Sequence, residues 1–141
     1  MRKRVFLAAL TVAVTGVMVS GNPALAGKPG QGAVREAVLT AAGDPAAVGI
    51  ARFTFYPNKN KICYRIEVSN IDSATAAHLH EDSASEPDPV KLNLKPPRDG
   101  SSRECIRNLG ERFIRHISKN PSNFYVDVHN PDVAVRGQLS G

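Results

Sequence analysis

Two alternating stretches separated by a turn are the feature that most constrains the fold of this 141-residue chain. Apolar residues recur at every second position from Gly49 to Tyr56 and again from Ile62 to Val68. A period of two is typical of β-strands that bury one face. The segment between them, Pro57–Asn60, is rich in turn-forming residues. We therefore predict a β-hairpin, with Cys63 on the less apolar face of its second strand.

Other short segments extend this pattern to an all-β domain. We predict further strands at residues 33–42, 76–80, 90–94, 124–129 and 133–139, with a Pro-, Gly- and Ser-rich loop at 95–103. The exception is a stretch in which Leu109, Phe113 and Ile117 recur every four residues, which predicts one short helix near 106–119. Short strands with regular turns and a single helix indicate an antiparallel β-sandwich or a Greek-key barrel.

The amino terminus has the composition of an export signal. Three basic residues at positions 2–4 precede fifteen uncharged residues from Val5 to Val19, and the small-x-small motif Ala24–Ala26 follows. Fifteen residues fall short of the ~20 that a membrane-spanning helix needs. We expect cleavage after Ala26 and secretion of the remainder, with 27–32 as a flexible segment, 33–141 as the domain and no membrane attachment after cleavage.

The net charge gives little support to a nucleic-acid partner. The predicted signal carries three basic and no acidic residues, so the formal charge falls from +5 for the whole chain to +2 for the remainder. Such a weak charge, without a lysine-rich stripe interleaved with aromatic residues, does not indicate binding to a phosphate backbone. We expect no nucleic acid and an extracellular partner whose identity the sequence does not specify.

The chain has two cysteines, Cys63 and Cys105. In an exported protein, an isolated pair predicts one disulfide. A thiolate metal site is the alternative, but it would need more cysteines close by. Because we place Cys105 at the start of the predicted helix, we expect the bond to join that helix region to the outer face of the hairpin.

Three of the four histidines lie on predicted strands. His78 and His80 are two residues apart, so an extended strand points both side chains to the same face. His129 ends another strand, on the same side as Asp127. If the strands are neighbours, the three histidines could bind one copper or zinc ion, with Asp127 and Glu81 as acceptors that orient the rings.

The alternative role for these histidines is structural, as members of a hydrogen-bonded polar cluster. The fourth histidine, His116, lies among basic residues of the predicted helix and is left out of the site. We find no Gly-x-Ser-x-Gly nucleophile motif and no glycine-rich phosphate loop, so we assign no catalytic residues.

Several motifs follow one another along the chain: His78-Leu79-His80, the run from Asn120-Pro121 to Val126-Asp127-Val128-His129, and the closing Arg136-Gly137-Gln138-Leu139. Their order resembles the CHRD domain, a family named after chordin. The resemblance implies an antiparallel Greek-key β-sandwich of immunoglobulin-like or superoxide-dismutase-like appearance and an extracellular role. It also implies histidines at the family's histidine positions, and no established activity. Two hypotheses follow: a non-catalytic binding or scaffold module, or an extracellular metalloprotein.

Overall fold

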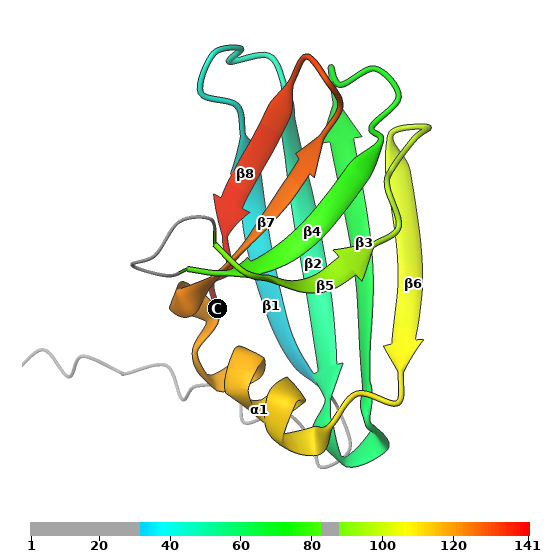
Figure 1. Cartoon of the computed structure of the whole chain (residues 1–141), viewed down its shortest axis with the longest axis vertical. Coiled ribbons are helices and arrows are strands. Elements are labelled where there is room, and N and C mark those ends of the chain that lie inside the picture. Colours follow the sequence, from blue (N-terminus) through cyan, green and yellow to red (C-terminus); the bar gives the residue numbers. More distant parts are fainter. Residues whose placement is uncertain (1–31, 83–87) are drawn as a thin grey trace, which may run out of the picture.

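The computed structural model describes residues 32–82 and 88–141. These residues form one α-helix, two 3-10 turns (η1 and η2) and eight strands that pair antiparallel in the order β5-β4-β7-β8-β1-β2-β3-β6 (Figure 1). The elements are β1 Ala33–Thr40, β2 Val48–Tyr56, η1 Pro57–Lys59, β3 Lys61–Ser69, β4 Ala76–Glu81, β5 Val90–Leu94, β6 Ser101–Arg107, α1 Glu111–Lys119, η2 Pro121–Asn123, β7 Phe124–His129 and β8 Ala134–Gln138. The predicted all-β antiparallel architecture with one helix is confirmed.

The sheet curls until it is nearly a barrel. Strands β5, β4, β7 and β8 lie across β1, β2, β3 and β6, and α1 lies across one end (Figure 1). The space between the two halves is filled by the alternate, inward-facing side chains, of which the largest fully buried ones include Phe53, Phe55, Phe124, Leu79 and Ile66. Because the sheet is continuous from β5 to β6, a division into two sheets with Greek-key connections stays a prediction.

The predicted hairpin is formed by β2 and β3. Its register runs from Val48 opposite Ser69 to Tyr56 opposite Lys61, and η1 makes the turn. Asn60 closes the turn with a φ of 48°, in the left-handed region that asparagine tolerates better than most residues. Local sequence signals therefore determine this part of the fold.

The segment around Cys105 differs from the prediction. Residues 101–107, expected to be partly loop and partly helix, form β6, and α1 begins only at Glu111. As an edge strand, β6 buries only Ser102 and partly buries Ile106, so its sequence carries a weak alternating pattern. The helix itself buries Ile114 and Ile117.

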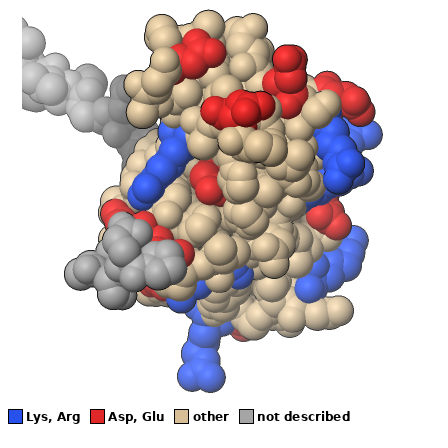
Figure 2. All heavy atoms as spheres, turned by 45° about the horizontal axis from the view of Figure 1, so that its top comes forward, with Lys and Arg blue, Asp and Glu red and all other residues tan. Residues whose placement is uncertain are grey.

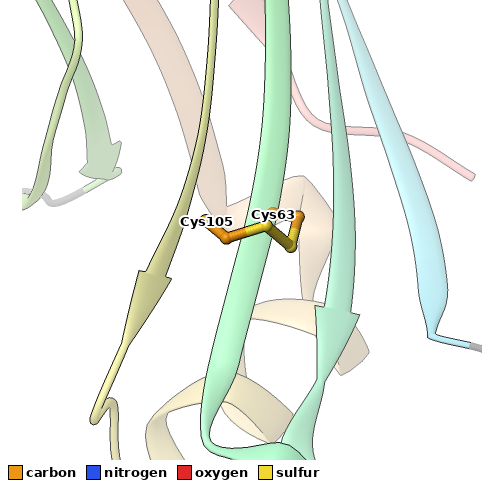
Figure 3. Close-up of a disulfide and its surroundings, with 2 residues drawn as sticks. All are labelled: Cys63 and Cys105. Atoms are coloured by element: carbon orange, nitrogen blue, oxygen red, sulfur yellow. A yellow bond between two sulfur atoms is a disulfide. The ribbon is translucent and has the colours of Figure 1, made fainter.

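The two cysteines form the predicted disulfide. Cys63 on β3 lies directly opposite Cys105 on β6, with the two Cα atoms 3.9 Å apart (Figure 3). Cys63 points away from the core, since Ile62 and Tyr64 on either side of it are buried, so its predicted outer-face position is confirmed. The bond cross-links two neighbouring strands and does not join the helix to the sheet.

Tyr64 helps to close the gap between the two edge strands, β5 and β6. Its buried hydroxyl accepts a hydrogen bond from the backbone N–H of Lys95, just after β5, at 2.6 Å. The same hydroxyl donates to Oε2 of Glu104 on β6 at 2.9 Å. Burial, with a smaller contribution from Glu104, raises the pKa of Tyr64 to about 12.

This raised pKa predicts a loss of stability at high pH. An unfolded tyrosine ionises near pH 10, so between pH 10 and about 12 the unfolded chain releases a proton that folded Tyr64 retains. The free energy of unfolding should therefore fall as pH rises through that window.

Burial also raises the pKa of Tyr125 to about 12. A pH-jump titration followed by tyrosinate absorbance should show two tyrosines ionising near pH 12 in the native protein. In Tyr64→Phe only one tyrosine should ionise there. If all the tyrosines of the native protein ionise near pH 10, the prediction is wrong.

The predicted signal at 1–26 and all but the last residue of the predicted flexible segment 27–32 lie outside the described residues. Within the described part of the chain, no helix has the length and apolar character required to cross a bilayer. On the face shown in Figure 2, acidic side chains are most numerous toward the top, and Lys and Arg lie in separate groups at both sides and at the bottom. That face has no continuous basic surface.

Candidate metal centre

The candidate site lies on the outer face of β4 and β7, which are neighbours in the sheet. In their register, His78 is opposite Asp127, and His80 is opposite Tyr125. The alternating residues between them, such as Leu79 and Val126, are fully buried in the core. Core burial on one face therefore forces the polar side chains of both strands onto the other face.

Three of these side chains converge closely enough to hold one metal ion. His78, Asp127 and His129 each offer one ligand atom, and the three atoms all lie within 4.8 Å of one another. Nδ1 of His78 is 3.0 Å from Oδ1 of Asp127, and Nε2 of His129 is 3.9 Å from Oδ2. Zinc binds imidazole nitrogen and carboxylate oxygen at ~2.0–2.2 Å, so small side-chain movements would close this group around an ion.

His80 lies beside this group but is not a member of it. Its Nδ1 is 3.1 Å from the backbone oxygen of Asp88, an acceptor, so Nδ1 must carry a proton. Its Nε2 is buried, has no hydrogen-bond partner among the described residues, and is 3.5 Å from Oδ1 of Asp127. In this tautomer the Nε2 lone pair faces a carboxylate, an arrangement that a shared metal cation would stabilise.

Two of the residues considered at the sequence level lie elsewhere. Glu81, expected to orient a histidine ring, instead forms ion pairs with Lys91 at 2.6 Å and with His116 at 3.0 Å. The hydrogen bond from His116, followed by that from Lys91, lowers the pKa of the Glu81 carboxyl. These contacts link the end of β4 to β5 and α1, so His116 has a structural partner outside the candidate centre.

The structure adds residues that fix the orientation of His80. The ring of Tyr125 is parallel to that of His80, with centroids 4.8 Å apart, and the Arg136 guanidinium carbon lies 3.3 Å from the Tyr125 centroid. The Tyr125 hydroxyl donates to Oδ2 of Asp88 at 3.0 Å, which holds Asp88 close to His80. The period of two already places Tyr125 on the face of Asp127, but no local pattern points to Asp88 or Arg136.

These observations define the class of protein. It is an antiparallel, nearly barrel-shaped β domain with a histidine–carboxylate cluster on its outer face. The family model of the CHRD domain matches residues 32–139, nearly all of the described chain. The protein belongs to the CHRD family. A comparison with curated proteins found no match.

Proposed function

We propose that the protein is an exported CHRD module that binds one zinc or copper ion on the outer face of β4 and β7. The observation that carries the proposal is the convergence of ligand atoms from His78, Asp127 and His129 within 4.8 Å. Imidazole and carboxylate together are ligands that suit zinc and copper. The buried, unpartnered Nε2 of His80, facing the carboxylate of Asp127, gives independent support for a cation at this place.

In this proposal the ion serves binding or structure and has no turnover of its own. His78, Asp127 and His129 hold it, and His80 completes the set once its Nε2 reaches the ion. Tyr125 and the backbone oxygen of Asp88 keep the His80 ring in place, as outer contacts commonly do for metal ligands. Both cysteines are in the disulfide, so neither offers a thiolate nucleophile.

Export of the module is part of the proposal. It is supported by the signal-like composition of residues 1–26 and by the disulfide, which persists in oxidising compartments. We also propose that the fold is a two-sheet Greek-key sandwich of the immunoglobulin-like or superoxide-dismutase-like kind. It is supported by the way one half of the curled sheet lies across the other (Figure 1).

A second candidate function is a metal-free module that binds an extracellular partner. The observation that favours it is the exposure of three valines on the outer face of β1 and β2, where Val38 is 71% exposed and Val34 and Val48 are also exposed. The ion pair between Glu36 and Arg52 lies between Val34 and Val38 on this face, so a partner would meet apolar and charged groups together. Metal analysis separates the two candidates.

We expect the natively exported protein to contain one zinc or copper ion per chain by elemental analysis. After chelation, titration with Zn²⁺ or Cu²⁺ should restore one ion and raise the melting temperature, since 100-fold excess over Kd adds ~2.7 kcal/mol of stability. His78→Ala and His129→Ala should each lower metal affinity by about 100-fold or more, because each removes a ligand. His80→Ala should also lower it.

The matched control is His116→Ala, which removes an imidazole that bonds Glu81 outside the cluster. Metal affinity should be unchanged in this variant. If the exported protein holds no stoichiometric metal and added ions leave the melting temperature unmoved, the metal proposal fails and the partner-binding candidate replaces it. Equal losses in His116→Ala and His78→Ala would also overturn the assignment of ligands.

A further inference from the structure

We propose that a second site, which shares no residue with the histidine cluster, binds a tetrahedral oxyanion: a phosphate or sulfate ester group on a small polar molecule. The site is a cavity of about 420 Å³ at the edge of the sheet where β6 pairs with β3 and the chain leaves β5. This inference does not depend on the metal proposal. The cavity is lined by Arg65, Lys95, Ser101, Ser102 and Arg103.

The first observation is an excess of positive charge in the cavity. Arg65 on β3 lies directly opposite Arg103 on β6, and like charges in opposed positions of an antiparallel pair destabilise it. Arg65 is paired with Glu67 at 2.6 Å. Within residues 32–82 and 88–141, no carboxylate lies in ion-pair distance of Arg103 or Lys95. An anion between these side chains would offset the repulsion.

The second observation is that the cationic side chains share the outer face of the sheet. Arg65 and Arg103 lie opposite each other on the face that also carries the disulfide. Ser102 lies opposite the buried Ile66, and its Oγ is closed to solvent, so its hydroxyl faces the core and not the cavity. The oxyanion would therefore be bound by Arg65, Arg103 and Lys95.

The arrangement of donors favours a tetrahedral group over a planar one. A carboxylate is matched by a single arginine that binds both of its oxygens in one plane. Here the donors come from three separate segments, β3, β6 and the residue after β5, which suits oxygens that point in several directions. The cavity is far larger than the ~30 Å³ share of one water. Since every lining side chain is polar, the rest of the ligand should be polar too.

The test uses the oxidised, full-length protein in EDTA, so that no metal at His78 contributes. Calorimetric titrations with sodium phosphate and with sodium sulfate are compared with sodium acetate and sodium chloride at equal ionic strength. We expect saturable 1:1 binding of phosphate, sulfate or both, and none of acetate or chloride. Titration with glucose 6-phosphate and with glucose 6-sulfate then distinguishes the two ester classes, and the preferred ester should bind more tightly than its free ion.

Three variants test the assignment of residues. Arg103→Gln should weaken binding by about 10- to 100-fold, the usual effect of losing a charge-assisted hydrogen bond. Ser102→Ala should leave anion affinity unchanged, because its Oγ is closed to solvent and faces the core. Arg107→Gln is the matched control, since Arg107 lies on the same face of β6, opposite Lys61, and does not line the cavity.

The opposite results would overturn the proposal. Equal heats or equal melting shifts with chloride would mean that added salt only screens the arginine pair. Equal affinity for acetate would exclude selection of a tetrahedral group. Unchanged affinity in Arg103→Gln would show that the anion does not bind in this cavity. A weakened Arg107→Gln variant would show that binding depends on overall charge.

Discussion

Removing the disulfide by the double substitution Cys63→Ser with Cys105→Ser is expected to lower the free energy of unfolding by about 4 kcal/mol. The bond closes a loop with a sequence separation of 42, and the chain-entropy estimate for a loop of this length gives that value. A small domain has a net stability of only ~5–15 kcal/mol, so the loss is a large share of the total. The melting temperature should fall by about 15 °C or more.

The place of the bond predicts where the damage appears. Cys105 lies on β6, an edge strand whose ladder partner is β3 alone, so β6 should separate from β3 before the rest of the sheet opens. Hydrogen exchange should therefore accelerate first in residues 101–107. Reduced wild-type protein should behave like the double-serine variant.

A double variant of the next outward pair is the matched control. Lys61→Ser with Arg107→Ser changes two outward-facing residues on the same strands without touching a cross-link, and it should alter stability by less than ~1 kcal/mol. Two free thiols per native chain, or an unchanged melting temperature in the double-serine variant, would contradict the prediction.

The second large effect is expected at Gly137, on β8. A Cβ atom at this position would lie 2.1 Å from the backbone oxygen and 2.7 Å from the carbonyl carbon of Val38, on β1. The contact lies in the seam that joins the two halves of the sheet, where β1 and β8 share the pair Thr40–Arg136 and the bridge Glu36–Ser140. Gly137→Ala should therefore destabilise the protein by about 3 kcal/mol or more, because main chain must move.

Two comparisons make this prediction specific. Gly43→Ala should change stability by less than ~1 kcal/mol, since a Cβ there would meet nothing within 4 Å. Val38→Gly combined with Gly137→Ala should not restore stability, because the clash is with the backbone of Val38 and not with its side chain. Urea unfolding of the wild type, Gly137→Ala, Gly43→Ala and the double variant measures these changes in stability. If Val38→Gly restores the stability of Gly137→Ala, or if Gly137→Ala has the stability of the wild type, the seam can relax and the prediction is wrong.

The clash at Gly137 also gives a physical reason for one motif of this sequence. The glycine in the closing Arg136-Gly137-Gln138-Leu139 motif is required by a backbone contact between β8 and β1. Arg136, next to it, lies over Tyr125, and Tyr125 stacks on His80. The closing strand therefore supports both the seam of the sheet and the wall of the candidate metal centre.

The sequence alone predicts the parts of this protein that depend on local patterns. The hairpin of β2 and β3, the strands Val90–Leu94 and Phe124–His129, and the disulfide are all confirmed. The strands rest on a period of two and on turn residues, and these signals act within short stretches of chain. The disulfide could be predicted because the chain has only one possible cysteine pair. The missed strand, β6, is an edge strand with little buried surface, so nearby apolar residues at helical spacing outweighed its weak alternation.

The candidate metal centre depends on the tertiary structure as well as on local sequence patterns. Alternation along a strand is a property of neighbouring residues, and it already places His78 and His80 on one face. The approach of His129 and Asp127 to His78 depends on the pairing of β4 with β7, strands about fifty residues apart in the chain. Arg136 is placed opposite Asp127 by the pairing of β8 with β7, and Asp88 is brought to His80 by the pairing of β5 with β4. The cavity beside Arg103 depends on the curl that brings the end of β5 close to β6. Strand pairing and curvature arise from burial of the shared core.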